Sequence, residues 1–99
     1  MQLTLQQIVD ERISFLKEQI NPHNKPEENR TFQLQIDAIR SAVAAATAVD
    51  DGIEVVETMI AEKKALLKKS EDVYEFDRLS AELEGLEWLQ RQIARLVWG

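Results

Sequence analysis

The chain has 99 residues, a hydrophobic fraction of 44% and a formal net charge of -6, values that fit one small globular domain over residues 1–99. The absence of Cys excludes disulfides and thiolate zinc sites. The negative charge argues against direct nucleic-acid binding and against an anionic membrane as the main partner. Few Gly and Pro, beside many Ala, Leu, Glu, Gln and Lys, predict an all-α fold.

The first predicted helix covers residues 4–20. Thr4 and Gln7 have the spacing of an N-terminal capping box, and apolar residues then recur every three to five positions. The helix ends before the Asn- and Pro-rich stretch 21–26, because proline disfavours a helical residue before it. This stretch holds the single histidine, His23, which we interpret as a solvated loop residue.

The second helix is predicted over residues 26–49 and the third over 51–69. Pro26 suits a first helical turn. Asp50 can cap a new helix and Gly52 lowers the cost of a kink, so the chain can break there. The same pattern also permits one continuous helix through Asp50–Gly52.

An alanine-rich segment near the end of the second helix has no charged residue, and its five alanines point in all directions around the axis. We expect this segment either to be central in the fold or to lie in an oligomer interface. The alternative is a solvated helix built from the best helix former. The predicted interface residues are Ala42, Ala45 and Ala46.

The fourth predicted helix covers residues 72–97, and Asp72 and Glu75 again have the spacing of a capping box. Apolar residues follow a coiled-coil-like spacing along this helix, with Gln90 as the one polar residue in the seam. A polar seam residue commonly sets register or oligomeric state, so we add Gln90 to the oligomer interface. The apolar seam residues are Phe76, Leu79, Leu83, Leu86, Ile93 and Val97.

A second line of residues lies nearly opposite this seam and includes Trp88. A tryptophan outside the main seam needs either a second neighbour in the bundle, such as the first helix, or a partner. Ala81 and Gly85 are small, so we predict a shallow groove beside Trp88, and we assign partner binding to this face. The predicted partner-binding residues are Tyr74, Ala81, Glu84, Gly85, Trp88 and Arg95.

Charge is polarised along the fourth helix. Residues 71–87 hold seven acids and one Arg, whereas residues 88–99 hold two Arg and no acid. This arrangement complements the helix dipole and leaves an acidic ledge that can bind a basic protein surface. We therefore predict a non-catalytic adaptor or inhibitor, of the kind common among small phage accessory proteins.

One alternative function is an oligomeric helical binder that sequesters a small anionic ligand such as a nucleotide. Lys64 and Lys68 lie one helical turn apart within a lysine cluster near the end of the third helix, and they are the candidate anion-binding residues. We prefer the interpretation that these lysines stabilise the negative end of the helix dipole and keep the protein in solution.

A second alternative function depends on carboxylates at helical spacing, which can hold Mg²⁺ through oxygen ligands. This spacing resembles the paired acidic motifs of the MazG-like family, all-α nucleoside triphosphate pyrophosphohydrolases that bind magnesium. The resemblance covers the acidic spacing alone, and the family's other residues and a basic substrate clamp are missing. We interpret most of these acids as helix N-terminal residues. They are Asp50, Asp51, Glu54 and Glu57, followed by Asp72 and Glu75.

Taken together, the patterns predict a small antiparallel bundle of three to four helices that is completed by homo-oligomerisation. We expect no catalytic residue, no metal site and no cofactor. No apolar run approaches the ~20 residues that span a bilayer, and the N-terminus lacks a secretory pattern. The expected location is the cytoplasm, without membrane attachment.

Overall fold

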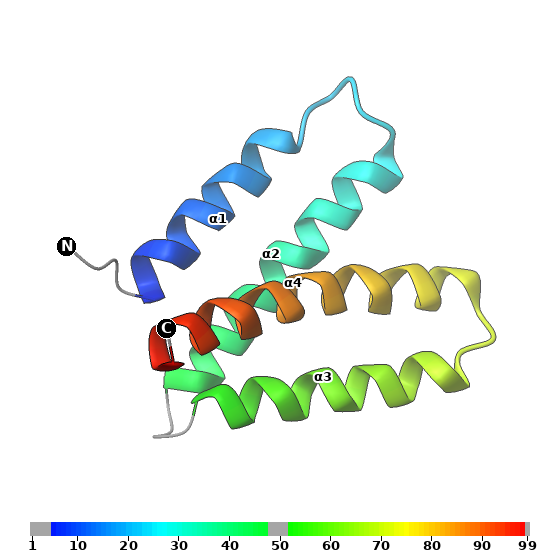
Figure 1. Ribbon diagram of the computed structural model, residues 1–99. Coiled ribbons are helices and arrows are strands. Elements are labelled where there is room, and N and C mark those ends of the chain that lie inside the picture. The colour runs from blue at the N-terminus through cyan, green and yellow to red at the C-terminus, as the bar shows by residue number, and fades with distance from the viewer. Residues whose placement is uncertain (1–4, 48–51, 99) are drawn as a thin grey trace.

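The computed structural model describes residues 5–47 and 52–98 (Figure 1). Within these ranges the chain forms four α-helices and no strand, which confirms the all-α prediction. Each helix begins and ends within two residues of its predicted bounds, and α2 and α3 are separate helices. The predicted caps Thr4 and Asp50 lie outside the described residues. The helices are α1 (Leu5–Gln19), α2 (Pro26–Thr47), α3 (Gly52–Lys69) and α4 (Val73–Trp98).

Asparagine side chains hold the turn between α1 and α2. Asn24 Nδ2 donates to the carbonyl oxygen of Gln19 at 2.6 Å, which satisfies a carbonyl at the end of α1. Asn29, in the first turns of α2, accepts from the Asn21 amide at 3.2 Å and donates to the Asn21 carbonyl at 2.9 Å. Its Oδ1 also accepts from Asn24 Nδ2 at 3.0 Å. Asn29 thereby fixes where α2 starts relative to the end of α1.

A side-chain cap starts α4. The amide of Tyr74 donates to Asp72 Oδ1 at 2.9 Å, which confirms Asp72 as the N-cap residue. Glu75 lies 3.9 Å from Arg78 on the next helical turn. The capping residue lets the chain reverse between Lys69 and Val73, so that α4 packs antiparallel to α3 (Figure 1).

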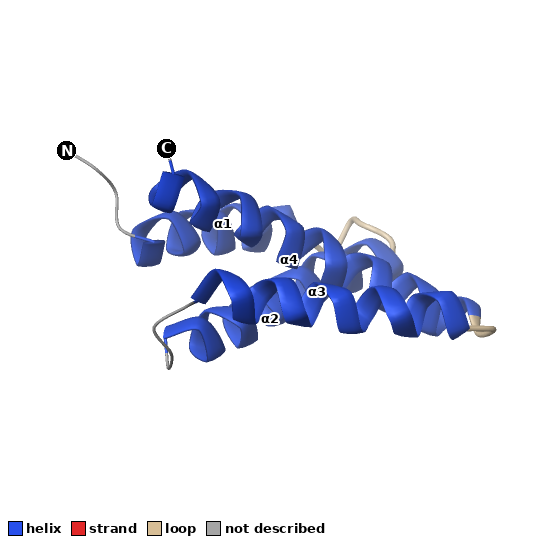
Figure 2. Cartoon of the chain, turned by 60° about the horizontal axis from the view of Figure 1, so that its bottom comes forward, coloured by secondary structure: helices blue, strands red, loops and turns tan. Residues whose placement is uncertain are grey.

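The helices form two hairpins that cross. In Figure 1 the connection between α1 and α2 lies at the top and the one between α3 and α4 at the right, while the start of α1 and the end of α4 lie on the left in both views (Figure 2). The hairpins meet chiefly through α2 and α4. A Cβ atom built on Gly85 would lie 3.0 Å from the Gln35 carbonyl oxygen and 3.3 Å from Ile39 Cγ1. The absence of a side chain at Gly85 therefore lets the two helices approach closely.

Both sides of α4 contribute to the core. The seam residues Leu79 and Leu86 are fully buried, as predicted, but Phe76 is 49% exposed. Leu89, outside the predicted seam, is also fully buried. The helix needs buried residues on two sides because α3 packs along it and α2 crosses it.

The alanine-rich end of α2 is central on one side only. Ala42 and Ala46 belong to the core, whereas Ala45 is half-buried and Ala44 is exposed. One chain therefore covers this segment on one side and leaves Ala44 exposed. Self-association through Ala42, Ala45, Ala46 and the half-buried Gln90 stays a prediction. Among the described helices, none is both long and apolar enough to cross a membrane.

Candidate protein-interaction site

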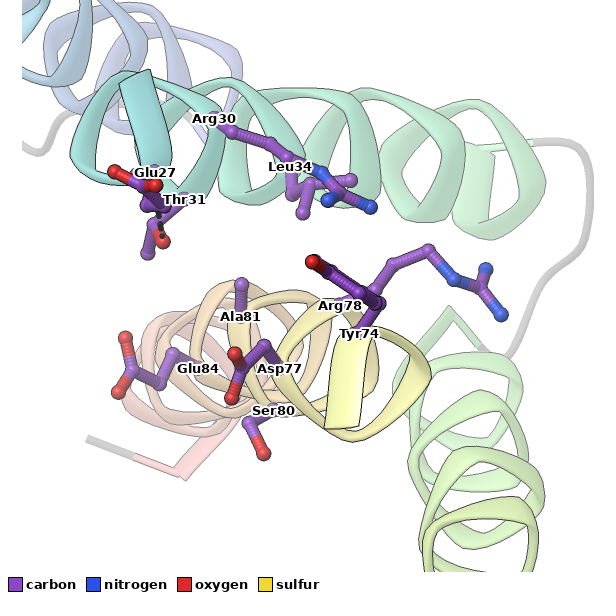
Figure 3. Close-up of a pocket in the computed structure, with 10 residues that line it drawn as sticks. All are labelled: Glu27, Arg30, Thr31, Leu34, Tyr74, Asp77, Arg78, Ser80, Ala81 and Glu84. Atoms are coloured by element: carbon purple, nitrogen blue, oxygen red, sulfur yellow. Dashed lines mark hydrogen bonds between the residues drawn. The ribbon is translucent and has the colours of Figure 1, made fainter. Parts of the chain in front are cut away.

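The N-terminal halves of α2 and α4 diverge from the crossing at Gly85 (Figure 1), and side chains of both helices line the space between them. We call this space the wedge. It contains a hollow of about 270 Å³ whose walls come from the two helices (Figure 3). The lining residues are Glu27, Arg30, Thr31 and Leu34 of α2, and Tyr74, Asp77, Arg78, Ser80, Ala81 and Glu84 of α4.

The helical period determines which residues line the wedge. On each helix the lining positions recur every three or four residues, which places them on one face. Ala81 points from α4 toward α2, and its small side chain leaves room between the two helices (Figure 3). Ala81 is itself 3% exposed, so it forms the floor of the wedge. Leu34 is half-buried on the opposite wall.

The charges of the wedge do not cancel one another. Arg78 lies 3.4 Å from Glu82 and 3.9 Å from Glu75, both outside the hollow, so its charge is already compensated. Glu27 and Asp77 form no ion pair within the described residues. Figure 3 shows the guanidinium groups of Arg30 and Arg78 pointing away from the carboxylates of Glu27 and Glu84. One end of the wedge is therefore acidic.

Glu84 is held at the inner end of the wedge by a contact between the hairpins. Its Oε2 accepts a hydrogen bond of 2.9 Å from Nε2 of Gln35, a residue that is only 7% exposed. This bond gives the buried amide nitrogen of Gln35 a partner, while the Glu84 side chain stays exposed. Gln35 thus orients one of the three carboxylates of the wedge.

Exposed apolar side chains lie at the outer end of the wedge. Tyr74 is 72% exposed and lines the hollow, and its neighbour Val73 is 71% exposed. Phe76 is half-exposed but does not line the hollow. Tyrosine combines a large apolar ring with a hydroxyl, a combination that favours protein interfaces.

Two of the six predicted partner-binding residues form part of a helix contact in the structure. Gly85 packs against α2 and Ala81 is buried, so these two small residues do not form the groove that was predicted beside Trp88. An open hollow of about 350 Å³ does lie beside Trp88, but Glu84 and residues of α1 and α2 line it instead of Ala81 and Gly85. Tyr74 and Glu84, together with Ala81 as the floor, instead border the wedge.

Trp88 has a neighbour in α1. It is half-buried against the core, and the Arg12 guanidinium carbon lies 5.4 Å from its ring centroid. Arg12 also lies 5.3 Å from the ring centroid of Phe15. Of the two neighbours considered for Trp88, a helix of the bundle or a partner, the structure therefore provides the first, because α1 covers it. Arg95, the last residue of the predicted line, is exposed.

The residues of the alternative functions are dispersed. Lys64 and Lys68 are exposed on α3, while the nearby Lys63 is paired with Glu82 of α4. Glu54 and Glu57 are exposed on α3, and Asp50 and Asp51 lie outside the described residues. In the described part of the chain, no group of three or more potential ligands is placed to hold a metal ion.

Sequence reasoning missed the α2 wall of the wedge. Glu27 and Leu34 are far from Tyr74 in the chain, and no local pattern indicates that α2 and α4 meet. The small residues Ala81 and Gly85 were the available signal, because small side chains allow close helix packing. Comparisons with protein families, characterised proteins and solved structures found no match for this chain.

Proposed function

We propose that the protein is a non-catalytic interaction module, an adaptor or inhibitor that binds a protein partner with a basic surface. The observation that supports this proposal is the set of carboxylates at the wedge, Glu27, Asp77 and Glu84, beside the exposed Tyr74. Exposed charges of one sign around an aromatic anchor are typical of protein–protein recognition.

The charge pattern from residue 71 to residue 87 supports a partner whose surface is positively charged. Seven acids and one Arg occur between residues 71 and 87, and that Arg contacts Glu75 and Glu82. The remaining negative potential favours encounter with a positively charged surface and disfavours acidic partners. Partner binding should therefore weaken as the salt concentration rises.

A comparison of charge variants tests the proposal. The tagged protein is incubated with lysate of the source organism, and the retained proteins are quantified by mass spectrometry. We expect a partner with a basic surface that is retained by the parent and lost when Glu27 and Asp77 of the wedge are both replaced by Lys. The matched control replaces Glu57 and Glu62, which are exposed on α3, by Lys.

Both double variants change the net charge equally, so a difference between them locates the contact at the wedge. The identified partner is then purified, and its affinity is measured as a function of salt concentration. Retention that is the same in both variants, or a partner whose affinity does not depend on salt, contradicts the proposal.

A further inference from the structure

We infer that the wedge binds an amphipathic helix of the basic partner, an inference that rests on the proposed function and names the element that is recognised. One apolar side chain of that helix would occupy the hollow between Leu34, Tyr74 and Ala81. Lysine or arginine residues beside it would face Glu27, Asp77 and Glu84. This is the helix-in-groove mode of recognition, in which anchors recur at helical spacing.

The dimensions of the wedge favour a helix. The lining runs from Glu27 to Leu34 on α2 and from Tyr74 to Glu84 on α4, which corresponds to about 10 Å and 15 Å of helix at about 1.5 Å per residue. Both walls are helices, whose interior backbone groups are bonded within the helix. An extended peptide would find no strand edge to pair with, whereas a helix of two to three turns matches the length of the lining.

The size of the hollow favours a single anchoring side chain. Its volume of about 270 Å³ is below the range of about 300–1,000 Å³ that is usual for sites that enclose a small molecule. The floor is apolar, formed by Ala81 and the half-buried Leu34, with the Tyr74 ring at the edge. A leucine or aromatic side chain would be buried there, while the helix that carries it lies along the rim.

The charges around the hollow determine the orientation of the occupant. Arg78 is compensated by Glu75 and Glu82, which leaves Arg30 against three carboxylates in the lining. Since the Arg30 head group points away from Glu27 and Glu84, a cationic side chain at the acidic end would meet no like charge (Figure 3). The occupant's basic residues would therefore lie toward Glu27 and Glu84.

The test uses a designed peptide of about 18 residues, long enough to form a helix in solution. It carries a Leu and Phe stripe at helical spacing with Lys along both sides of the stripe, and a fluorescein label for anisotropy. A second peptide has the same composition in an order that destroys the stripe. A third replaces every Lys by Glu.

We expect the parent protein to bind the first peptide and to discriminate against the other two. Tyr74→Ala and Asp77→Lys should each weaken binding by about tenfold or more, as expected when an anchor contact or a facing charge is lost. Phe76→Ala and Glu71→Lys are the matched controls, because Phe76 lies on α4 and Glu71 just before it, both outside the hollow. Each control should change the affinity by about twofold or less. Circular dichroism and thermal melting check that all four variants stay folded.

Three results would overturn the inference and still leave the proposed function to be judged by the lysate experiment. The first is equal binding of the striped and scrambled peptides, which indicates charge attraction without a groove. The second is a loss in Phe76→Ala and Glu71→Lys as large as in the wedge variants, which places the contact on the outer surface of α4. The third is a dimer in analytical ultracentrifugation that Asp77→Lys disrupts, which makes a second copy the occupant.

Discussion

The half of α4 that precedes Gly85 and the half that follows it belong to one continuous helix but have different neighbours. After Gly85, Leu86 and Leu89 are fully buried, and α1 reaches α4 through the contact of Arg12 with Trp88. Before Gly85, Leu79 is also fully buried, but Tyr74 and Phe76 in the first turn are exposed, because α2 has diverged there and α1 does not extend this far. The amphipathic pattern specifies where apolar residues lie on a helix, but the number of helices that cover them depends on the crossing.

The largest expected effect distinguishes the covered half from the open half by stability. Leu89→Ala removes a fully buried side chain and should lower the free energy of unfolding by about 2–5 kcal/mol. Phe76→Ala, in the open half, removes a half-exposed ring and should cost less than about 1 kcal/mol. Urea denaturation followed by circular dichroism measures both. Equal losses would mean that the first turn of α4, which carries Phe76, is covered as fully as the part around Leu89.

The second prediction tests the boundary between the halves. Gly85→Leu places a large side chain where a Cβ atom alone would lie 3.0 Å from the Gln35 carbonyl oxygen. The resulting overpacking should lower the free energy of unfolding by about 1–3 kcal/mol. Gly85→Ala is the control, because its better helix propensity, about 1 kcal/mol, offsets part of the crowding. A Leu variant as stable as the parent would show that α2 and α4 do not touch there.

The smallest expected effect concerns the contact that covers Trp88. Arg12→Ala removes the guanidinium from the Trp88 and Phe15 rings and should lower the free energy of unfolding by about 1 kcal/mol. Arg40→Ala, an exposed position on α2, is the control and should have almost no effect. A second readout is the emission of Trp88 in a Trp98→Phe background, which should shift to the red only in the Arg12 variant. An unchanged emission spectrum would argue against the coverage of Trp88 by Arg12.

The helices were predictable because their signals are local. Pro26 starts α2 and Asp72 caps α4 through residues a few positions away, and the apolar period does not depend on distant parts of the chain. Which helices pack together was not predictable, because a glycine such as Gly85 is expected in the sequence both where a helix borders a groove and where two helices are in close contact. Tyr74 and Glu84 were found from their place on α4, and both border the wedge.

The α2 wall of the wedge shows why the rest of the site could not be predicted from the sequence. Glu27 is an ordinary acid in the first turn of α2, where the helix dipole alone accounts for it. Its position opposite Asp77 depends on how the two hairpins cross, and that crossing depends on contacts between residues far apart in the chain. A single sequence carries no local sign of such a contact. The side-chain bond between Gln35 and Glu84 was missed for the same reason.

The hairpin arrangement also has a consequence for the order in which the chain folds. Each hairpin joins helices that are neighbours in sequence through a short turn, so its loop closes at a low entropic cost. The contact between α2 and α4 joins more distant segments, and such contacts generally form later. The wedge has one wall from each hairpin, so it comes into existence only when the hairpins dock. A chain whose four helices have formed but not docked would therefore present no wedge to a partner.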